Sequence, residues 1–177
     1  MSNRPAPASS RANPAGSRET LPRIVLAIGL PGSGKSTWFK NRNITPLATD
    51  HLRLLLADDE DEQRFQAEIF ASLRYLIRRR LDFKRPVTYV DATNLTRLFR
   101  RQFFEIAKTR PCRIEALYFD VPFEVCVERN RNRGRKVPAK IMQAMFEKMT
   151  PPSLQEGFQH ITTIDANGRT TGVIQSR

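Results

Sequence analysis

Short apolar runs alternate along the chain with stretches of helical periodicity, and each run carries a glycine or an aspartate near its end. Five runs have the length and the β-branched content of buried strands. They are RIVLAIGL (23–30), ITPLATD (44–50), RPVTYVDATN (85–94), CRIEALYFDV (112–121) and FQHITTID (158–165). Because strands that alternate with helices form a mostly parallel sheet, the pattern predicts an α/β fold with about four to five strands.

The stretches between these runs predict helices. The longest covers 64–83, where Phe65, Ile69, Leu73 and Ile77 recur at helical spacing. The others begin at Ser36 or cover 97–109, 123–136 and 138–149. We therefore expect one domain over 22–165, flanked by a disordered basic tail over 1–21 and a C-terminal tail over 166–177.

Four residues at predicted strand ends are candidates for a common site: Gly29, Asp50, Asp91 and Asp120. In open α/β sheets, ligands bind beyond the carboxyl ends of the strands. We expect one cleft to collect most of these residues.

The segment GLPGSGKST follows the first predicted strand and precedes a helix. Gly29, Gly34, Lys35 and Ser36 satisfy the pattern G-x-x-x-x-G-K-[ST], which a chain of this length shows by chance only ~1% of the time. Inward-facing backbone amides at a helix N-terminus bind phosphate, Lys35 reaches the β- and γ-phosphates, and Ser36 supplies an oxygen to Mg²⁺. The predicted ATP-binding residues are Gly29, Pro31, Gly32, Ser33, Gly34, Lys35, Ser36 and Thr37.

This motif alone does not separate switches, motors and kinases. The sequence contains no N-K-x-D motif of the kind that reads a guanine base. The chain also has little room for the additional strands and arms of a motor. Its size favours a phosphotransferase.

A kinase needs a group that deprotonates the acceptor hydroxyl and cations that stabilise the transferred phosphoryl group. Asp50 is the candidate base, and Arg53, three residues later, lies on the same helical face. Asp91 is the candidate carboxylate for Mg²⁺, while Arg129 and Arg133, at i and i+4, form a candidate lid over ATP. Each has a structural alternative: Asp50 can cap a helix, Asp91 can form an Asx turn, and the arginines can be solvated.

The chain carries a formal net charge of +12. The first 21 residues hold three arginines against one glutamate, so most of the excess lies in the predicted domain. Nucleic acid is the natural partner of such a surface, although a basic protein need not bind a polyanion. The densest basic stretch comprises Arg74, Arg78, Arg79, Arg80, Lys84 and Arg85.

Targeting and redox features are sparse. Cys112 and Cys126 lack the spacing of a zinc site and are interpreted as reduced, buried thiols. No apolar run approaches the roughly 20 residues of a membrane span. We expect a cytoplasmic protein with no membrane partner; the tail over 1–21 also has the composition of a transit peptide, but its arginines lack amphipathic spacing.

These motifs together resemble the kinase domain of the 5′-hydroxyl polynucleotide kinases of bacterial and phage nucleic-acid repair, members of the P-loop kinase superfamily. The resemblance covers about residues 22–150. It rests on GLPGSGKSTW, TDHLRLLLADDEDEQ, VDATN and FDVPFEVCVERNRNRGRKVP. The Asp50 and Arg53 pair, together with the lid segment, is the most selective part.

The resemblance implies a three-layer sandwich with a helical lid that uses ATP and Mg²⁺ and acts on the 5′-OH ends of RNA or DNA. Asp50 would take the proton from the 5′-OH, and Arg53 would bind the acceptor's 3′-phosphate or the transferred group. Arg129 and Arg133 would clamp ATP. The amino-acid sequence around Asp91 differs from that of the phage enzymes. A kinase for small molecules and a non-catalytic nucleotide-binding module are the alternatives.

Overall fold

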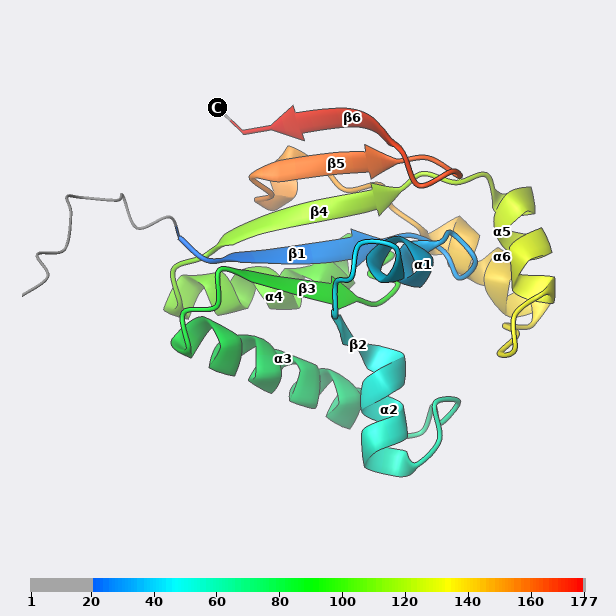
Figure 1. Ribbon diagram of the computed structural model, residues 1–177, viewed down its shortest axis with the longest axis horizontal. Coiled ribbons are helices and arrows are strands. Elements are labelled where there is room, and N and C mark those ends of the chain that lie inside the picture. Colours follow the sequence, from blue (N-terminus) through cyan, green and yellow to red (C-terminus); the bar gives the residue numbers. More distant parts are fainter. Residues whose placement is uncertain (1–20, 177) are drawn as a thin grey trace, which may run out of the picture.

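The computed structural model describes residues 21–176, which form a six-stranded sheet between layers of helices (Figure 1). The strand order is β2-β3-β1-β4-β5-β6. All neighbouring strands are parallel except β5 and β6, which are antiparallel. The strands are β1 (Arg23–Ile28), β2 (Leu47–Ala48), β3 (Val87–Asp91), β4 (Arg113–Phe119), β5 (His160–Ile164) and β6 (Thr170–Gln175). The predicted α/β class with a mostly parallel sheet is confirmed.

Both faces of the sheet are covered, which explains why β1 is apolar from Ile24 to Ile28. Ile24, Leu26 and Ile28 pack into one core with α3 and α4, while Val25 and Ala27 face a second core with α1, α5 and α6. Figure 1 shows α5 and α6 at the end of the sheet toward which the parallel strands point. The helices are α1 (Lys35–Lys40), α2 (Thr49–Ala57), α3 (Gln66–Asp82), α4 (Arg97–Thr109), α5 (Phe123–Arg131), α6 (Ala139–Lys148) and the short 3₁₀ helix η1 (Leu154–Glu156).

The second strand is much shorter than the apolar run over 44–50 predicts. β2 contains only Leu47 and Ala48, and α2 begins at Thr49, so that Asp50 lies in the first turn of a helix. The preceding Pro46 has no amide hydrogen to donate to a sheet, which limits the strand on that side. Asp50 is therefore positioned by α2 rather than by a strand.

The prediction of a C-terminal tail over 166–177 is wrong. Thr170–Gln175 forms β6, which follows a tight turn after β5. The Asp165 carboxylate accepts hydrogen bonds from the amides of Asn167 and Arg169, both at 2.8 Å. Every residue of β6 is exposed, so the strand has no buried face and no alternating pattern that could reveal it.

The predicted N-terminal tail, apart from Leu21, lies outside the described residues. None of the helices formed between residues 21 and 176 combines the length and the apolar character required to cross a bilayer.

Candidate active site

The phosphate loop, residues 29–37, lies at the carboxyl edge of the sheet and comprises the turn after β1 and the first three residues of α1. Gly32 and Gly34 adopt positive φ angles of 81° and 93°. Gly34 is also the residue that precedes α1, and no side chain caps this helix. Amides of such a turn therefore remain available to an anion at the start of α1.

Gly32 is required by its surroundings as well as by its φ angle. A Cβ atom at this position would lie against the backbone carbonyl oxygen of Cys126 in α5, closer than real Cβ atoms approach. The phosphate loop thus packs backbone to backbone against α5, which also carries Arg129.

We expect Gly32→Ala to lower the free energy of unfolding by about 2–4 kcal/mol, because it combines a left-handed backbone with overpacking. Thermal and urea unfolding measure this loss. Gly134→Ala is the matched control, since a Cβ at Gly134 meets no atom within 4 Å and its φ is ordinary. A Gly32→Ala protein as stable as the control would contradict the close packing of the loop against α5.

Lys35 is folded back over the loop. Its Nζ donates to the carbonyl oxygens of Gly29 and Leu30, each at 2.8 Å, and to Ser33 Oγ at 3.3 Å. Burial lowers the pKa of Lys35 to about 8, and the negative charge of Asp91 opposes part of this shift. Because burial makes the charged form of Lys35 unfavourable in the free protein, the Lys35 ammonium interacts favourably with a polyphosphate that binds in the loop.

This pKa predicts a pH dependence of nucleotide binding. A bound polyphosphate raises the pKa of Lys35, so binding above pH 8 draws a proton onto a neutral amine. Affinity is therefore fully present below pH 8 and falls as the pH rises from 8 toward the pKa in the complex. Calorimetry at pH 8.5 in buffers of different ionisation enthalpy should detect this proton uptake. Lys35→Met should abolish it; uptake unchanged in that variant would assign the proton to another group.

Ser36 and Asp91 meet beside Lys35. Ser36 Oγ donates a hydrogen bond to Asp91 Oδ2 at 2.7 Å, which joins the start of α1 to the end of β3. Burial raises the pKa of the Asp91 carboxyl, and the charge of Lys35 counteracts this. A hydroxyl and a carboxylate oxygen beside a phosphate loop are the hard ligands that Mg²⁺ takes from proteins, so this donor set fits the metal.

Asp50 and Arg53 form a close pair on α2. Arg53 Nη1 donates to Asp50 Oδ1 at 2.6 Å, and its Nη2 donates to Gln66 Oε1 at 2.7 Å. Arg53 is 5% exposed, so the alternative of a solvated surface charge is wrong. Its Nε is buried without a partner among the described residues, which leaves one donor for a further acceptor. Burial lowers the pKa of Arg53 although Asp50 stabilises its charge.

The structure adds Arg135 to the site, a residue that the sequence did not single out. It donates to Asp50 Oδ1 at 2.8 Å and also pairs with Asp61 in the acidic loop after α2. Arg135 lies in an irregular segment between α5 and α6, where helical spacing gives no signal. It ties the lid to the aspartate and to the acidic loop.

Arg129 and Arg133 approach the phosphate loop differently from the prediction. α5 ends at Arg131, so Arg133 lies beyond the helix and the two arginines do not share a helical face. Arg129 Nη2 donates to the carbonyl oxygen of Ala166 at 2.7 Å, while its Nη1 lies near Gly34. Arg133 lines the same cavity as Lys35.

A cavity of about 1440 Å³ collects most of these groups. The predicted strand-end residue Asp120 does not line it; Asp120 is exposed and accepts a hydrogen bond from the Tyr118 hydroxyl at 3.2 Å. Gly29 does not line the cavity either; its carbonyl oxygen accepts a hydrogen bond from Lys35 Nζ. The lining includes Pro31, Gly32, Ser33, Gly34, Lys35, Ser36, Thr37, Asp50, Arg53, Asp91, Arg129, Arg133 and Arg135.

Comparison with known proteins finds kinases among the proteins that this chain resembles. L-seryl-tRNA(Sec) kinase of Methanococcus maripaludis is 29% identical over 136 residues, which cover 73% of this chain and 53% of that protein. The chain therefore spans about half the length of this curated relative.

Two solved structures share the fold. The structure of a Pnkp1/Rnl/Hen1 RNA repair complex superposes with a TM-score of 0.62 at 19% identity, over 73% of this chain and 44% of that chain. A sugar kinase from Janibacter sp. HTCC2649 superposes with a TM-score of 0.58 at 20% identity, over 82% of this chain and 86% of that one. At these identities the likeness establishes the fold alone.

A family model described as an AAA domain matches residues 24–152, which include the phosphate loop, α2 and the lid. The matched segment covers most of the described chain. The protein therefore belongs to the AAA_33 family of AAA domains, and its fold is that of the P-loop kinases.

Proposed function

We propose that the protein transfers the γ-phosphoryl group of ATP to the 5′-hydroxyl end of a nucleic acid. The observation that carries this proposal is the pairing of Asp50 with the buried Arg53 in the cavity that also holds the phosphate loop. A nucleotide switch or a passive binding module has no need for a carboxylate fixed opposite its phosphate site. A phosphotransferase needs one to receive the acceptor's proton.

The donor is held by the phosphate loop and Lys35, whose ammonium exchanges the loop carbonyls for phosphate oxygens. Ser36 and Asp91 would hold Mg²⁺, which neutralises charge on the β- and γ-phosphates when bound. Arg129 and Arg133 approach from the lid and stabilise the charge that spreads over the transferred group.

Asp50 accepts the proton of the attacking hydroxyl. The hydroxyl oxygen forms a bond to the γ-phosphorus, the bond from that phosphorus to the β–γ bridging oxygen breaks, and ADP leaves with its electron pair. Arg53 orients Asp50 through the 2.6 Å hydrogen bond, and its unpartnered Nε supplies a donor toward an acceptor phosphate.

Three observations support a polynucleotide acceptor. The chain has a net charge of +12, a curated relative is a kinase named for a tRNA, and one structural neighbour belongs to an RNA repair complex. A small hydroxyl acceptor is the second candidate, favoured by the likeness to the sugar kinase over most of both chains.

The test is transfer of γ-labelled phosphate from ATP, with Mg²⁺, to a 20-nucleotide RNA that carries a 5′-OH. Its 5′-phosphorylated twin, seryl-tRNA and a set of free sugars are the comparison acceptors. Label on the 5′-OH strand alone, lost in Asp50→Asn, supports the proposal. Label on the twin or on seryl-tRNA assigns a different hydroxyl, and label on a sugar alone replaces the proposal with the small-acceptor function.

A further inference from the structure

Arg100 is a charged residue at a core position. The buried side of α4 carries Arg100, Phe103 and Ile106 at the spacing of a helical face, where the periodicity predicts apolar side chains throughout. Arg100 is nevertheless fully buried. Its guanidinium forms a bidentate ion pair with Glu156 in η1, from Nε to Oε2 at 2.8 Å and from Nη2 to Oε1 at 2.7 Å. The Glu156 side chain is only 4% exposed, so the whole pair lies inside the protein.

Stability alone does not explain this pair. Taking two charges out of water costs free energy that their attraction offsets only in part, so apolar side chains of similar volume often stabilise a core as well or better. The remaining nitrogen of the guanidinium shows what the arginine adds. Arg100 Nη1 donates to the carbonyl oxygens of Asn94, Leu95 and Thr150, at 3.0, 3.1 and 3.0 Å. Glu156 therefore orients a guanidinium that joins two loops.

The first loop, residues 92–95, follows directly on Asp91, the last residue of β3. Its Asn94 has a φ of 49°, a left-handed conformation that the surrounding structure has to support. One side of the loop is attached to the phosphate loop, because the amide of Gly29 donates to a carbonyl oxygen of this loop at 3.1 Å. The other side is attached to Arg100. Arg100 thus helps to set the position of Asp91, although it does not itself line the cavity.

The second loop comes at the end of the lid, which consists of α5, α6 and the segment that joins them. Thr150 follows just after α6. Its amide donates to the carbonyl oxygen of Leu95 at 2.9 Å, and its own carbonyl oxygen accepts from Arg100. Both backbone polar groups of Thr150 therefore attach the lid to the loop after β3. The segment between the two lid helices carries Arg133 and Arg135.

We propose that Arg100 is a positioning residue for the nucleotide site, which holds the candidate metal carboxylate Asp91 and the base of the lid at a fixed spacing. Asp91 and the lid residue Arg133 line one cavity, so Mg²⁺ and the lid would act on the same phosphates. A displacement of about 1 Å between such groups is enough to impair their joint action. The inference rests on the nucleotide site of the proposed function and is independent of the acceptor.

The test uses two variants that keep the core filled. Arg100→Ala would leave Glu156 buried without a partner, and we expect it to unfold the protein. Arg100→Met/Glu156→Gln removes both charges together, while glutamine keeps an oxygen for the amide of Ser153, which now donates to Glu156 Oε1 at 3.1 Å. Arg100→Lys keeps a positive charge beside Glu156 but has one donor nitrogen in place of three.

Calorimetric titration with ATP, in Mg²⁺ and separately in EDTA, measures the effect. With Mg²⁺ we expect Kd to rise about tenfold in both variants, the lower end of the loss that follows removal of an outer partner of a metal ligand. In EDTA, Kd should equal that of wild type, because the phosphate loop and Lys35 are unchanged. A purely structural residue would alter both values or neither.

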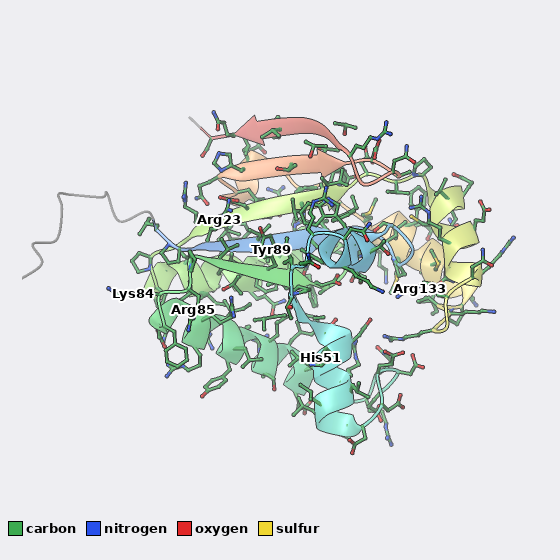
Figure 2. All side chains as sticks on the ribbon, in the orientation of Figure 1. Arg23, His51, Lys84, Arg85, Tyr89 and Arg133 are labelled. Atoms are coloured by element: carbon green, nitrogen blue, oxygen red, sulfur yellow. The ribbon has the colours of Figure 1, made fainter. Side chains whose placement is uncertain are left out.

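Arg23→Met/Glu115→Gln is the matched control. It removes another ion pair, at 3.1 Å, between β1 and β4. Figure 2 shows Arg23 where β1 begins, at the opposite end of the sheet from Arg133. This variant should bind ATP as wild type does under both conditions.

Arg133→Ala tests the link to the lid. We expect it to weaken ATP binding in Mg²⁺ less in the Arg100→Lys background than in wild type, because the lid is already displaced there. Residues that act through one element give such non-additive losses, whereas independent residues give additive ones.

An equal loss of ATP affinity with and without Mg²⁺ would overturn the proposal, as would unchanged affinity in both conditions. Additive losses from Arg100→Lys and Arg133→Ala would overturn the link to the lid and the proposal with it. If wild type transfers phosphate to no hydroxyl acceptor, but the Arg100 variants lose ATP affinity only in Mg²⁺, the proposed function fails and the positioning role stands.

Discussion

Replacement of Asp50 by asparagine is expected to lower kcat by about 10²–10⁴-fold, the usual contribution of a general base. Asparagine keeps the size of the side chain and an oxygen that can accept from Arg53 and Arg135, but it cannot take up the acceptor's proton. Binding of ATP should persist, because no residue of the phosphate loop contacts Asp50 through a described hydrogen bond. Single-turnover transfer of labelled phosphate measures the loss.

Asp120→Asn is the control for this variant. Asp120 follows β4 much as Asp91 ends β3, yet it is exposed and does not line the cavity. Its replacement should leave kcat unchanged. If Asp50→Asn turned over as fast as Asp120→Asn, Asp50 would be assigned to helix capping and removed from the mechanism.

Lys35→Met is the second substitution for which we expect a large loss of activity. It removes a buried cation from the phosphate loop while keeping an unbranched side chain of comparable length. Loss of one donor to developing transition-state charge costs about 10²–10³ in kcat, and ATP affinity falls as well. Steady-state kinetics over a range of ATP concentrations separate the two losses.

Lys108→Met provides the comparison for this substitution, because Lys108 is exposed on α4 and pairs with Glu105. It should behave as wild type. A Lys35→Met enzyme with full kcat and only a raised KM for ATP would show that Lys35 binds the ground state and the transition state equally.

The sequence predicted the elements that have a buried face. β1 is apolar from Ile24 to Ile28, and β4 is mostly apolar apart from Arg113 and Glu115, because both faces of the sheet are covered; the helix over 97–109 has the predicted bounds. The sequence did not predict the elements whose residues show no pattern of buried and exposed positions. β2 is only two residues long, and β6 is exposed throughout and is held by backbone pairing with β5.

Some residues of the candidate site could likewise be predicted from the sequence, and others could not. The phosphate loop, Asp50 and Arg53 follow from spacing within one local element, and the structure brings them to one cavity. Arg135 could not be found, because its contacts with Asp50 and Asp61 join segments far apart in sequence through an irregular loop. Likewise, α5 ends at Arg131, although the sequence predicts a helix that continues to 136.

The contact of Arg135 with Asp50 has a kinetic consequence. An acceptor hydroxyl has to compete with Arg135 for the same carboxylate, and Arg135 belongs to the segment that also carries Arg133. In the proposed reaction, we expect a bound nucleotide to draw that segment toward its phosphates and away from Asp50. We therefore expect the two substrates to add in sequence, with the nucleotide first, so that Asp50 becomes available to an acceptor, or to water, only after the donor is in place.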